Sequence, residues 1–247
     1  MARVHSGLGA VSSTPVVLAW SGGKDSALAL EALREDAAWD VRGLLTTVTS
    51  GYDRVAIHGV RRDILHAQAR ALGLPLVEAW LEPRSSNDAY EHAWRDALDR
   101  AAKTFGAFRH VAYGDLFLED VRAYRDALMT RLGYAPVYPI WGRPTDGLAR
   151  AFIRSGYRAY LTCVDTTQLD ARFAGRAFDD ELLGDLPATV DPCGERGEFH
   201  TCVVAGPAFR APIPVALGER VLRDGRFQYC DLIMASAPCA ADAPAPT

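Results

Sequence analysis

The chain has 247 residues, a formal net charge of −4 and ordinary shares of hydrophobic (49%) and charged (23%) residues. This length suits one large α/β domain or two smaller ones. The negative charge argues against a broad nucleic-acid surface, and no apolar run approaches the roughly 20 residues of a membrane span. Residues 1–15 lack the apolar core of a signal peptide, and the five cysteines form no CxxC pair. We therefore expect a cytoplasmic protein with reduced thiols, no membrane partner and no structural zinc site.

Short apolar runs alternate with amphipathic helical patterns through the first half of the chain. Strands are predicted at residues 16–20, 41–48, 76–80 and 110–113, and helices at residues 26–34, 60–72, 87–105 and 120–132. Gly73 and Gly133 directly follow two of these helices and are typical of helix ends. The alternation predicts an α/β fold, a doubly wound and mostly parallel sheet with right-handed crossovers.

The pattern changes after residue 134. The segment APVYPIWGRP (135–144) contains three prolines, which is typical of a domain junction. Beyond it we predict helices at 145–156 and 179–185, strands at 159–163 and 201–206, and a hairpin of 220–222 with 226–232 around Asp224-Gly225. The expected organisation is a flexible N-terminus (1–14), a first domain (15–134), a smaller α+β lobe (135–234) and a disordered tail (235–247).

The sequence SGGKDS directly follows the first predicted strand and precedes the first predicted helix. The first turn of a helix has unpaired N–H groups and a partial positive charge, so this junction suits an anion. The glycines let a phosphate approach the backbone, the serines offer hydroxyls, and the lysine supplies a positive charge. The aspartate repels a bare anion, which indicates bound Mg²⁺ or a helix cap. The residues predicted to bind phosphate and Mg²⁺ are Ser21, Gly22, Gly23, Lys24, Asp25 and Ser26.

SGGKDS does not have the spacing of a Walker A loop. It resembles the PP-loop of the N-type ATP pyrophosphatases, members of the adenine nucleotide alpha hydrolase-like superfamily, which split ATP between its α and β phosphates. The resemblance implies ATP and Mg²⁺ as cofactors, and an ATP pyrophosphatase domain over residues 15–134. It also implies nucleoside contacts at Thr46 and Thr47, although β-propensity alone explains threonines there. His58 is a candidate contact for the nucleotide or acceptor, or else a surface loop residue.

Two further stretches resemble the diphthine–ammonia ligase family, whose members amidate diphthine on an elongation factor to make diphthamide. GDLFLEDVRAYRDALMTRLGYAPVYPIW (114–141) matches a Gly-Asp-Ile element and a Pro-Leu-Trp element. DPCGERGEFHTCVVAGPAF (191–209) matches a Gly-Glu-x-Gly-Glu-Tyr/Phe-His-Thr signature. The resemblance covers residues 16–232, and stretches such as FLEDVRAYRDALM look more like the family's bacterial members. It implies the family's fold and ATP chemistry, with an acceptor that need not be diphthine.

Carboxylates outside the loop complete the candidate site. Asp115 follows the fourth strand at the sheet edge where ligands bind, so it would hold Mg²⁺ or the acceptor, or else cap a turn. Glu195 and Glu198 share a Gly-rich turn, where two negative charges so close together repel each other. A bound cation or a substrate amine would offset this repulsion. The alternative is that one of the two carboxylates pairs with an arginine and joins the two lobes. His200 would share a strand face with Glu198. The predicted catalytic residues are Lys24, Asp25, Asp115, Glu195, Glu198 and His200, with Asp25 and Asp115 as metal ligands.

These patterns predict an enzyme, a ligase that adenylates a carboxylate, releases pyrophosphate and lets ammonia displace AMP to form an amide. No glutaminase region is recognisable, so the ammonia is free or comes from a partner. The acceptor carboxylate, on a protein or on a small molecule, stays unidentified. A non-catalytic ATP/AMP-binding module and a tRNA-modifying ATP pyrophosphatase are the alternatives, and the acidic charge counts against the second. The oligomeric state, a homodimer included, is left open.

Overall fold

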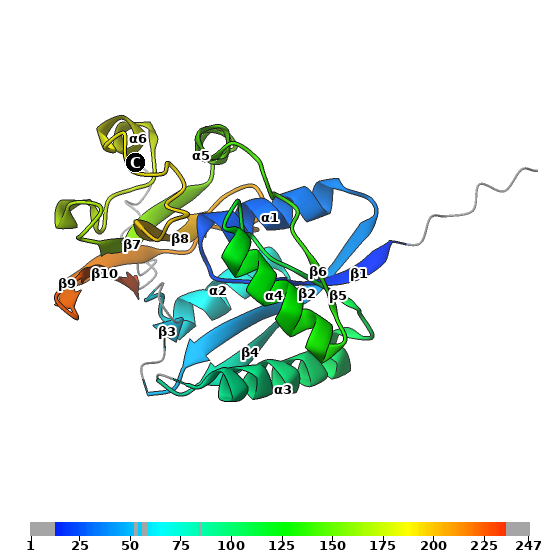
Figure 1. Ribbon diagram of the computed structural model, residues 1–247. Helices are drawn as coiled ribbons and strands as arrows, with labels where there is room; N and C mark the ends of the chain where they lie inside the picture. Colours follow the sequence, from blue (N-terminus) through cyan, green and yellow to red (C-terminus); the bar gives the residue numbers. More distant parts are fainter. Residues whose placement is uncertain (1–12, 52–53, 56–58, 84, 236–247) are drawn as a thin grey trace, which may run out of the picture.

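Figure 1 shows the computed structural model of the chain, in which two sheets and their helices form two adjoining lobes. The described residues are 13–51, 54–55, 59–83 and 85–235. His58 and most of the two ends expected to be flexible, residues 1–12 and 236–247, lie outside these ranges. None of the described helices is both long and apolar enough to cross a membrane.

The first lobe is a doubly wound α/β sheet, as predicted. Its elements are β1 (Thr14–Ala19), α1 (Lys24–Glu35), β2 (Trp39–Thr49), β3 (Arg54–Val55), α2 (Arg62–Leu72), β4 (Leu76–Leu81), α3 (Asn87–Phe105), β5 (His110–Ala112), α4 (Glu119–Leu132) and β6 (Ala135–Val137). Five strands are parallel in the order β4-β2-β1-β5-β6, and the short β3 pairs antiparallel with the end of β2.

Consecutive residues of β1 face opposite sides of this sheet. Val16 and Leu18 pack with α1 and α2, whereas Val17 packs with α3 and α4. The alternation follows from the pleat of a strand, and both faces are covered, so the strand is apolar on consecutive positions. Because β1, β2 and β5 are parallel, their carboxyl ends lie at the same edge of the sheet. Residues such as Trp20, Thr46 and Tyr113 line a cavity at this edge.

The second lobe is a four-stranded antiparallel sheet in the order β8-β7-β10-β9. Its elements are α5 (Thr145–Arg154), β7 (Arg158–Asp165), the 3-10 helix η1 (Ala171–Phe173), α6 (Asp180–Asp185), β8 (Phe199–Ala205), β9 (Val215–Arg223) and β10 (Phe227–Met234). The predicted hairpin is confirmed between β9 and β10. Asp224 and Gly225 form its turn with φ angles of 51° and 61°, the left-handed conformation that Asp and Gly accept most readily.

The proline-rich segment after residue 134 contributes to the first sheet. Its first three residues form β6, which pairs with β5 although Pro136 has no N–H to donate. This is allowed because β6 is the last strand of the sheet, and an edge strand needs ladder bonds on one side only. The boundary expected between residues 134 and 135 thus precedes the last strand of the first sheet.

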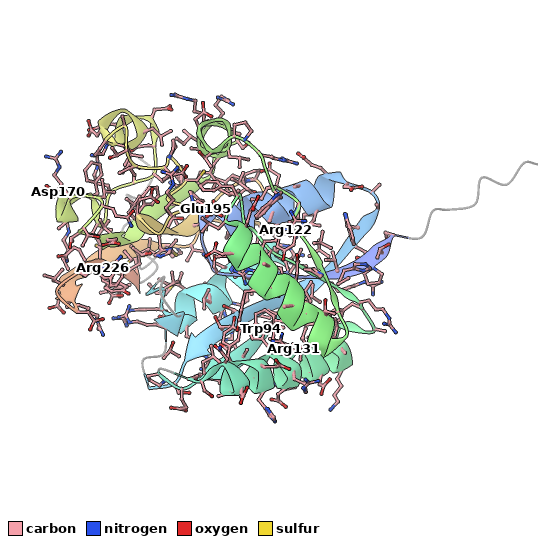
Figure 2. All side chains as sticks on the ribbon, in the orientation of Figure 1. Trp94, Arg122, Arg131, Asp170, Glu195 and Arg226 are labelled. Atoms are coloured by element: carbon pink, nitrogen blue, oxygen red, sulfur yellow. The ribbon has the colours of Figure 1, made fainter. Side chains whose placement is uncertain are left out.

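The two lobes share one hydrophobic core. Leu30 of α1 and Ile64 of α2 belong to the same buried cluster as Leu161 and Phe199 of the second lobe. Polar contacts add to this packing, since the N–H of Val203 donates to the carbonyl of Gly22 at 2.9 Å. Figure 2 shows Glu195 where the lobes meet, with Trp94 and Arg131 in the first lobe and Asp170 and Arg226 in the second.

Candidate functional site

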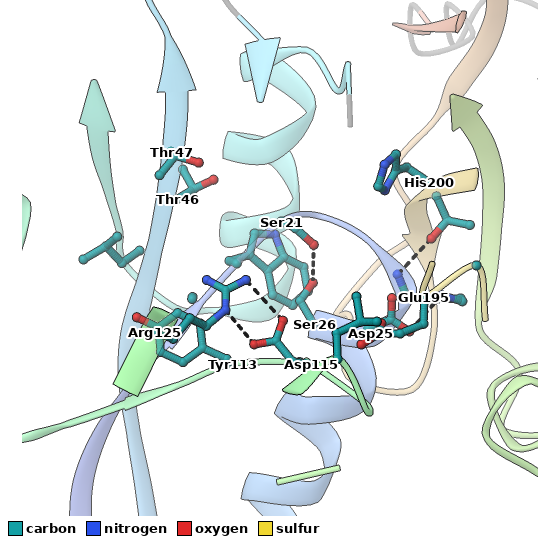
Figure 3. Close-up of a pocket in the computed structure, with 18 of the residues that line it drawn as sticks. Ser21, Asp25, Ser26, Thr46, Thr47, Tyr113, Asp115, Arg125, Glu195 and His200 are labelled. Carbon is teal, nitrogen blue, oxygen red and sulfur yellow. Dashed lines mark hydrogen bonds and ion pairs between the residues drawn. The ribbon is translucent and has the colours of Figure 1, made fainter. Parts of the chain in front are cut away.

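A cavity of about 360 Å³ lies at the carboxyl edge of the first sheet, and the second lobe closes one side of it (Figure 3). This volume is within the usual range for a small-molecule site. The predicted site residues in its wall are Ser21, Lys24, Asp25, Ser26, Thr46, Thr47, Asp115, Glu195 and His200. The tertiary structure therefore brings together most of the residues selected from the sequence.

The SGGKDS loop turns sharply between β1 and α1. Gly22 has a φ of +81°, a conformation that L residues with a side chain rarely adopt. The N–H of Gly23 donates to Ser21 Oγ at 3.2 Å, and the Ser26 hydroxyl donates to the carbonyl of Gly23 at 2.8 Å. These bonds hold the loop closed on itself, with the first turn of α1 directed at the cavity.

Gln68 of α2 holds the SGGKDS loop in place through hydrogen bonds. Its side chain is fully buried, and its Oε1 accepts a hydrogen bond from Trp20 Nε1 at 2.8 Å. Its Nε2 donates to the carbonyls of Gly22 at 3.0 Å and Val203 at 2.7 Å. One amide thus joins the end of β1, the loop and strand β8, and no pattern around residue 68 in the sequence indicates this role.

Lys24 is 2% exposed, yet it lies in the cavity wall. Its Nζ is 2.8 Å from both carboxylate oxygens of Asp25 and within 6 Å of the ring centroids of Phe178 and Phe199. Burial works against the positive charge, but the neighbouring Asp25 carboxylate raises the pKa of Lys24 above its usual value. Burial raises the pKa of Asp25 as well, although the charge of Lys24 works against this.

Asp115 and Arg125 form an ion pair in the cavity wall, shown in Figure 3. Arg125 Nε lies 2.6 Å from Asp115 Oδ2, and Arg125 Nη2 donates to Oδ1 at 3.1 Å. The guanidinium also lies 4.4 Å from the ring centroid of Tyr113. Burial opposes its charge, but the Asp115 carboxylate raises the pKa of Arg125. Arg125 was not among the residues predicted from the sequence, where it resembles any charge on an exposed helix.

Glu195 reaches back from the second lobe to the first. Its Oε1 accepts hydrogen bonds from the backbone N–H groups of Leu116 at 2.8 Å and Phe117 at 3.4 Å. Burial raises the pKa of Glu195 to about 7, and the negative charge of Asp25 adds to this effect. A carboxyl group with this pKa exchanges protons near neutral pH.

Glu198 and His200 have different surroundings. Glu198 is 1% exposed and outside the cavity wall, and its Oε1 accepts from the N–H of Asp191 at 2.9 Å. It therefore braces the Gly-rich turn of residues 191–198. His200 does line the cavity, and burial together with the charge of Lys24 lowers the pKa of His200 to about 4. Its imidazole is neutral at pH 7.

The cavity also contains unsatisfied polar atoms. Within the described part of the chain, Thr46 Oγ1 and Tyr113 Oη are buried and have no hydrogen-bond partner. Burial raises the pKa of Tyr113, so its phenol stays protonated and can donate. Buried polar groups in native proteins almost always have partners, so these two hydroxyls point to a bound ligand. Tyr113 precedes Gly114-Asp115 directly, which was the available sequence signal for it.

The carboxylates of the cavity wall suit a Mg²⁺ ion only if a bound substrate supplies further oxygen ligands. No group of three or more His, Cys, Asp or Glu side chains in the described ranges could hold a metal ion by itself. Mg²⁺ usually binds through one or two carboxylates and completes its shell with water and substrate phosphates. Asp25 and Asp115 fit this need, because both line the cavity with side chains that are 28% and 15% exposed.

Comparisons with known proteins found two matching family models, a similar curated protein and a similar solved structure. The model of the diphthamide synthase N-terminal domain matches residues 14–135, and that of the diphthamide synthase C-terminal domain matches residues 144–234. The diphthine–ammonia ligase of Schizosaccharomyces pombe is 22% identical over 193 residues, 73% of this chain and 32% of that protein, so the chain spans less than half of that relative. The crystal structure of a predicted subunit of tRNA methyltransferase from Methanocaldococcus jannaschii has a TM-score of 0.41 and 16% identity, covering 78% of this chain and 98% of that one.

The two matched regions contain the two halves of the cavity wall. The N-terminal match includes the SGGKDS loop and Asp115, and the C-terminal match includes Glu195 and His200. Since the two models together match most of its length, in order, the chain belongs to the diphthamide synthase family.

Proposed function

We propose that this chain is an ATP-dependent ligase of the diphthine–ammonia ligase type. It would adenylate a carboxylate, release pyrophosphate and transfer ammonia to form an amide. The placement of Lys24 carries the proposal: this residue begins α1 and lines the cavity, and its amino group contacts the carboxylate of Asp25. The lysine cation and the helix N-terminus can bind the negative charges of a polyphosphate, and the aspartate carboxylate can bind Mg²⁺.

The loop would hold the β and γ phosphates of ATP. The first N–H groups of α1 have no partners within the helix, and the helix dipole favours an anion at that end. Lys24 Nζ, which contacts Asp25 in the free protein, would turn to a phosphate oxygen. Asp25 and Asp115 would then hold Mg²⁺, which supplies positive charge to stabilise the departing pyrophosphate.

The nucleoside would lie toward the end of β2. The hydroxyl of Thr46, which has no hydrogen-bond partner among the described residues, lies there, and Thr47 lines the same wall. The rings of Trp94 and Tyr113, 6.1 Å apart between centroids, line the cavity and offer an aromatic surface to a purine base. A nucleotide placed in this way would span the cavity from the aromatic wall to the loop.

The proposed reaction has two steps, adenylation of the carboxylate and displacement of AMP by ammonia. An oxygen of the acceptor carboxylate attacks the α phosphorus, the bond from that phosphorus to the bridging oxygen breaks, and pyrophosphate leaves. Ammonia then attacks the acyl carbon, the bond from that carbon to its bridging oxygen breaks, AMP leaves with this oxygen, which came from the carboxylate, and the nitrogen loses a proton. Glu195 would accept this proton, because its pKa of about 7 lets it do so at neutral pH.

The decisive experiment follows the α phosphate of labelled ATP in the presence of Mg²⁺, ammonium and fractionated cell extract as the source of acceptor. We expect AMP from the wild type and at least a hundredfold less from Lys24→Met. Lys103→Met is the matched control, because Lys103 is the other lysine of the chain and lies exposed on α3. ADP as the product would indicate a kinase. ATP binding that depends on Lys24 but yields no product in any fraction would indicate a binding module.

A further inference from the structure

Strand β8 of the second lobe runs against the SGGKDS loop of the first. The N–H of Val203 donates to the carbonyl of Gly22 at 2.9 Å, and the N–H of Lys24 donates to Thr201 Oγ1 at 3.1 Å. The carbonyl of Thr201 is also close, 3.1 Å from the position that a Cβ on Gly23 would occupy. The backbone of β8 therefore forms one side of the loop.

The hydroxyl of Thr201 takes the place of an anion at the helix N-terminus. Lys24 is the first residue of α1, and its N–H belongs to the set that a bound phosphate normally receives. In this structure that N–H is used by Thr201 Oγ1 instead. A hydroxyl that accepts one bond still has its own proton to donate.

The hydroxyl of Thr201 belongs to a residue of the cavity wall. Thr201 is 2% exposed and lines the cavity wall, and within the described ranges its hydroxyl takes part in no hydrogen bond other than the one from Lys24. Donation from Lys24 polarises the hydroxyl, which strengthens the bond that it can donate in turn. Lys24 lines the same cavity, so an anion bound there would lie against both residues.

We propose that Thr201 is a phosphate-binding residue contributed by the second lobe, which donates its hydroxyl proton to a β or γ phosphoryl oxygen. The inference rests on the proposed function in one respect, that the loop binds a polyphosphate. The anion site is then built by both lobes, and ligands without a pyrophosphate group do not benefit from Thr201. A purely structural threonine would only cap the Lys24 N–H and would affect all ligands alike.

The test is calorimetric titration of Mg·ATP, Mg·pyrophosphate and AMP into the wild type, Thr201→Val and Thr201→Ser. We expect Thr201→Val to weaken ATP and pyrophosphate binding about tenfold or more, the usual effect of losing one hydrogen bond to a charged group. AMP binding should change less than about twofold, and Thr201→Ser should retain most of the affinity because it keeps the hydroxyl. Thr162→Val is the matched control, since Thr162 is buried on the neighbouring strand, outside the cavity wall, and donates to the carbonyl of His200.

Thr201→Ala serves as a second hydroxyl-free variant if the valine variant does not fold, because a water can then reach the Lys24 amide. Equal losses for AMP and pyrophosphate, or unchanged pyrophosphate affinity in the hydroxyl-free variant, would overturn the proposal. A wild type that binds neither ATP nor pyrophosphate would overturn both proposals. Selective loss of pyrophosphate affinity in a protein that never forms AMP would support the role of Thr201 while rejecting the ligase.

Discussion

The backbone N–H of Lys24 donates to the hydroxyl of Thr201 at 3.1 Å, across 177 residues of sequence. Together with the bond from Val203 to Gly22, it makes the loop conformation depend on the second lobe. The candidate phosphate loop is thus not a self-contained strand–turn–helix unit. The lobes also share one hydrophobic core, so apolar packing as well as these bonds holds them together.

Gly114→Ala should destabilise the protein and displace the loop. A Cβ at Gly114 would lie 2.8 Å from both the carbonyl carbon and the carbonyl oxygen of Asp25, and backbone atoms cannot yield as a flexible side chain can. We expect a loss of about 1–3 kcal/mol in the free energy of unfolding, as for other overpacked sites, and weaker Mg·ATP binding. Chemical denaturation and calorimetric titration measure the two effects.

Gly147→Ala is the control for this prediction. Gly147 lies within α5, and a Cβ there would meet no atom within 4 Å. Alanine is the better helix former, so the control should leave the stability unchanged or raise it by about 0.5–1 kcal/mol. If both alanine variants behaved alike, the contact between Gly114 and Asp25 would not matter.

Glu195→Gln should change how stability depends on pH. The pKa of Glu195 is about 7 in the folded protein, against 4.5 for the unperturbed group, so the folded state holds an extra proton between these values. The unfolding free energy of the wild type therefore falls, relative to that of Glu195→Gln, as the pH rises from about 4.5 to about 7, and levels off above. Denaturation of both proteins between pH 4.5 and 8 measures this difference.

The titration of His200 does not affect the difference in stability between the wild type and Glu195→Gln. Its pKa is lowered to about 4, so it destabilises the folded state as the pH falls below 6.5, but it does so in both proteins. A difference between wild type and variant that stayed constant from pH 4.5 to 8 would show that Glu195 titrates normally. If Glu195 accepts the proton from ammonia, the ammonia-dependent activity of the wild type falls as the pH drops below about 7. This fall should be absent from the pH profile of Glu195→Gln.

Asp231→Asn should loosen the junction of the lobes. Asp231 of β10 accepts from Arg54 Nη1 at 2.6 Å and from Arg61 Nε at 3.0 Å, both in the first lobe, and its side chain is 13% exposed. Burial opposes the carboxylate charge, but these two bonds lower the pKa of Asp231 to about 2. We expect the variant to lose about 1–3 kcal/mol of stability at pH 7. The stabilisation should be present above pH 4 and disappear as the pH falls toward 2.

Asp40→Asn is the matched control for Asp231. Asp40 pairs with Arg42 on the surface, where their side chains are 36% and 45% exposed. Solvent screening makes such a pair worth about 0–1 kcal/mol, so this variant should unfold almost like the wild type. Equal effects of the two substitutions would mean that Asp231 does not hold the lobes together.

The alternation of apolar runs and amphipathic helices was sufficient to predict the doubly wound sheet. Consecutive apolar residues such as Val16, Val17 and Leu18 are typical of a strand that is covered on both faces. The hairpin at Asp224-Gly225 and the helix end at Gly73 were predictable for a similar reason, since left-handed backbone favours few residue types. β6 was not predicted, because Pro136 argues against a strand until the edge position is known.

Of the candidate site, the sequence by itself determined the SGGKDS loop, because strand, glycines and helix start are local properties of six neighbouring residues. Only the tertiary structure decided which distant side chains join that loop. It placed Gln68 and Thr201 against the loop, paired Asp115 with Arg125, and directed Glu198 to the N–H of Asp191 outside the cavity wall. These contacts depend on how α2, α4 and β8 pack in three dimensions, and buried polar groups take whichever partner that packing supplies.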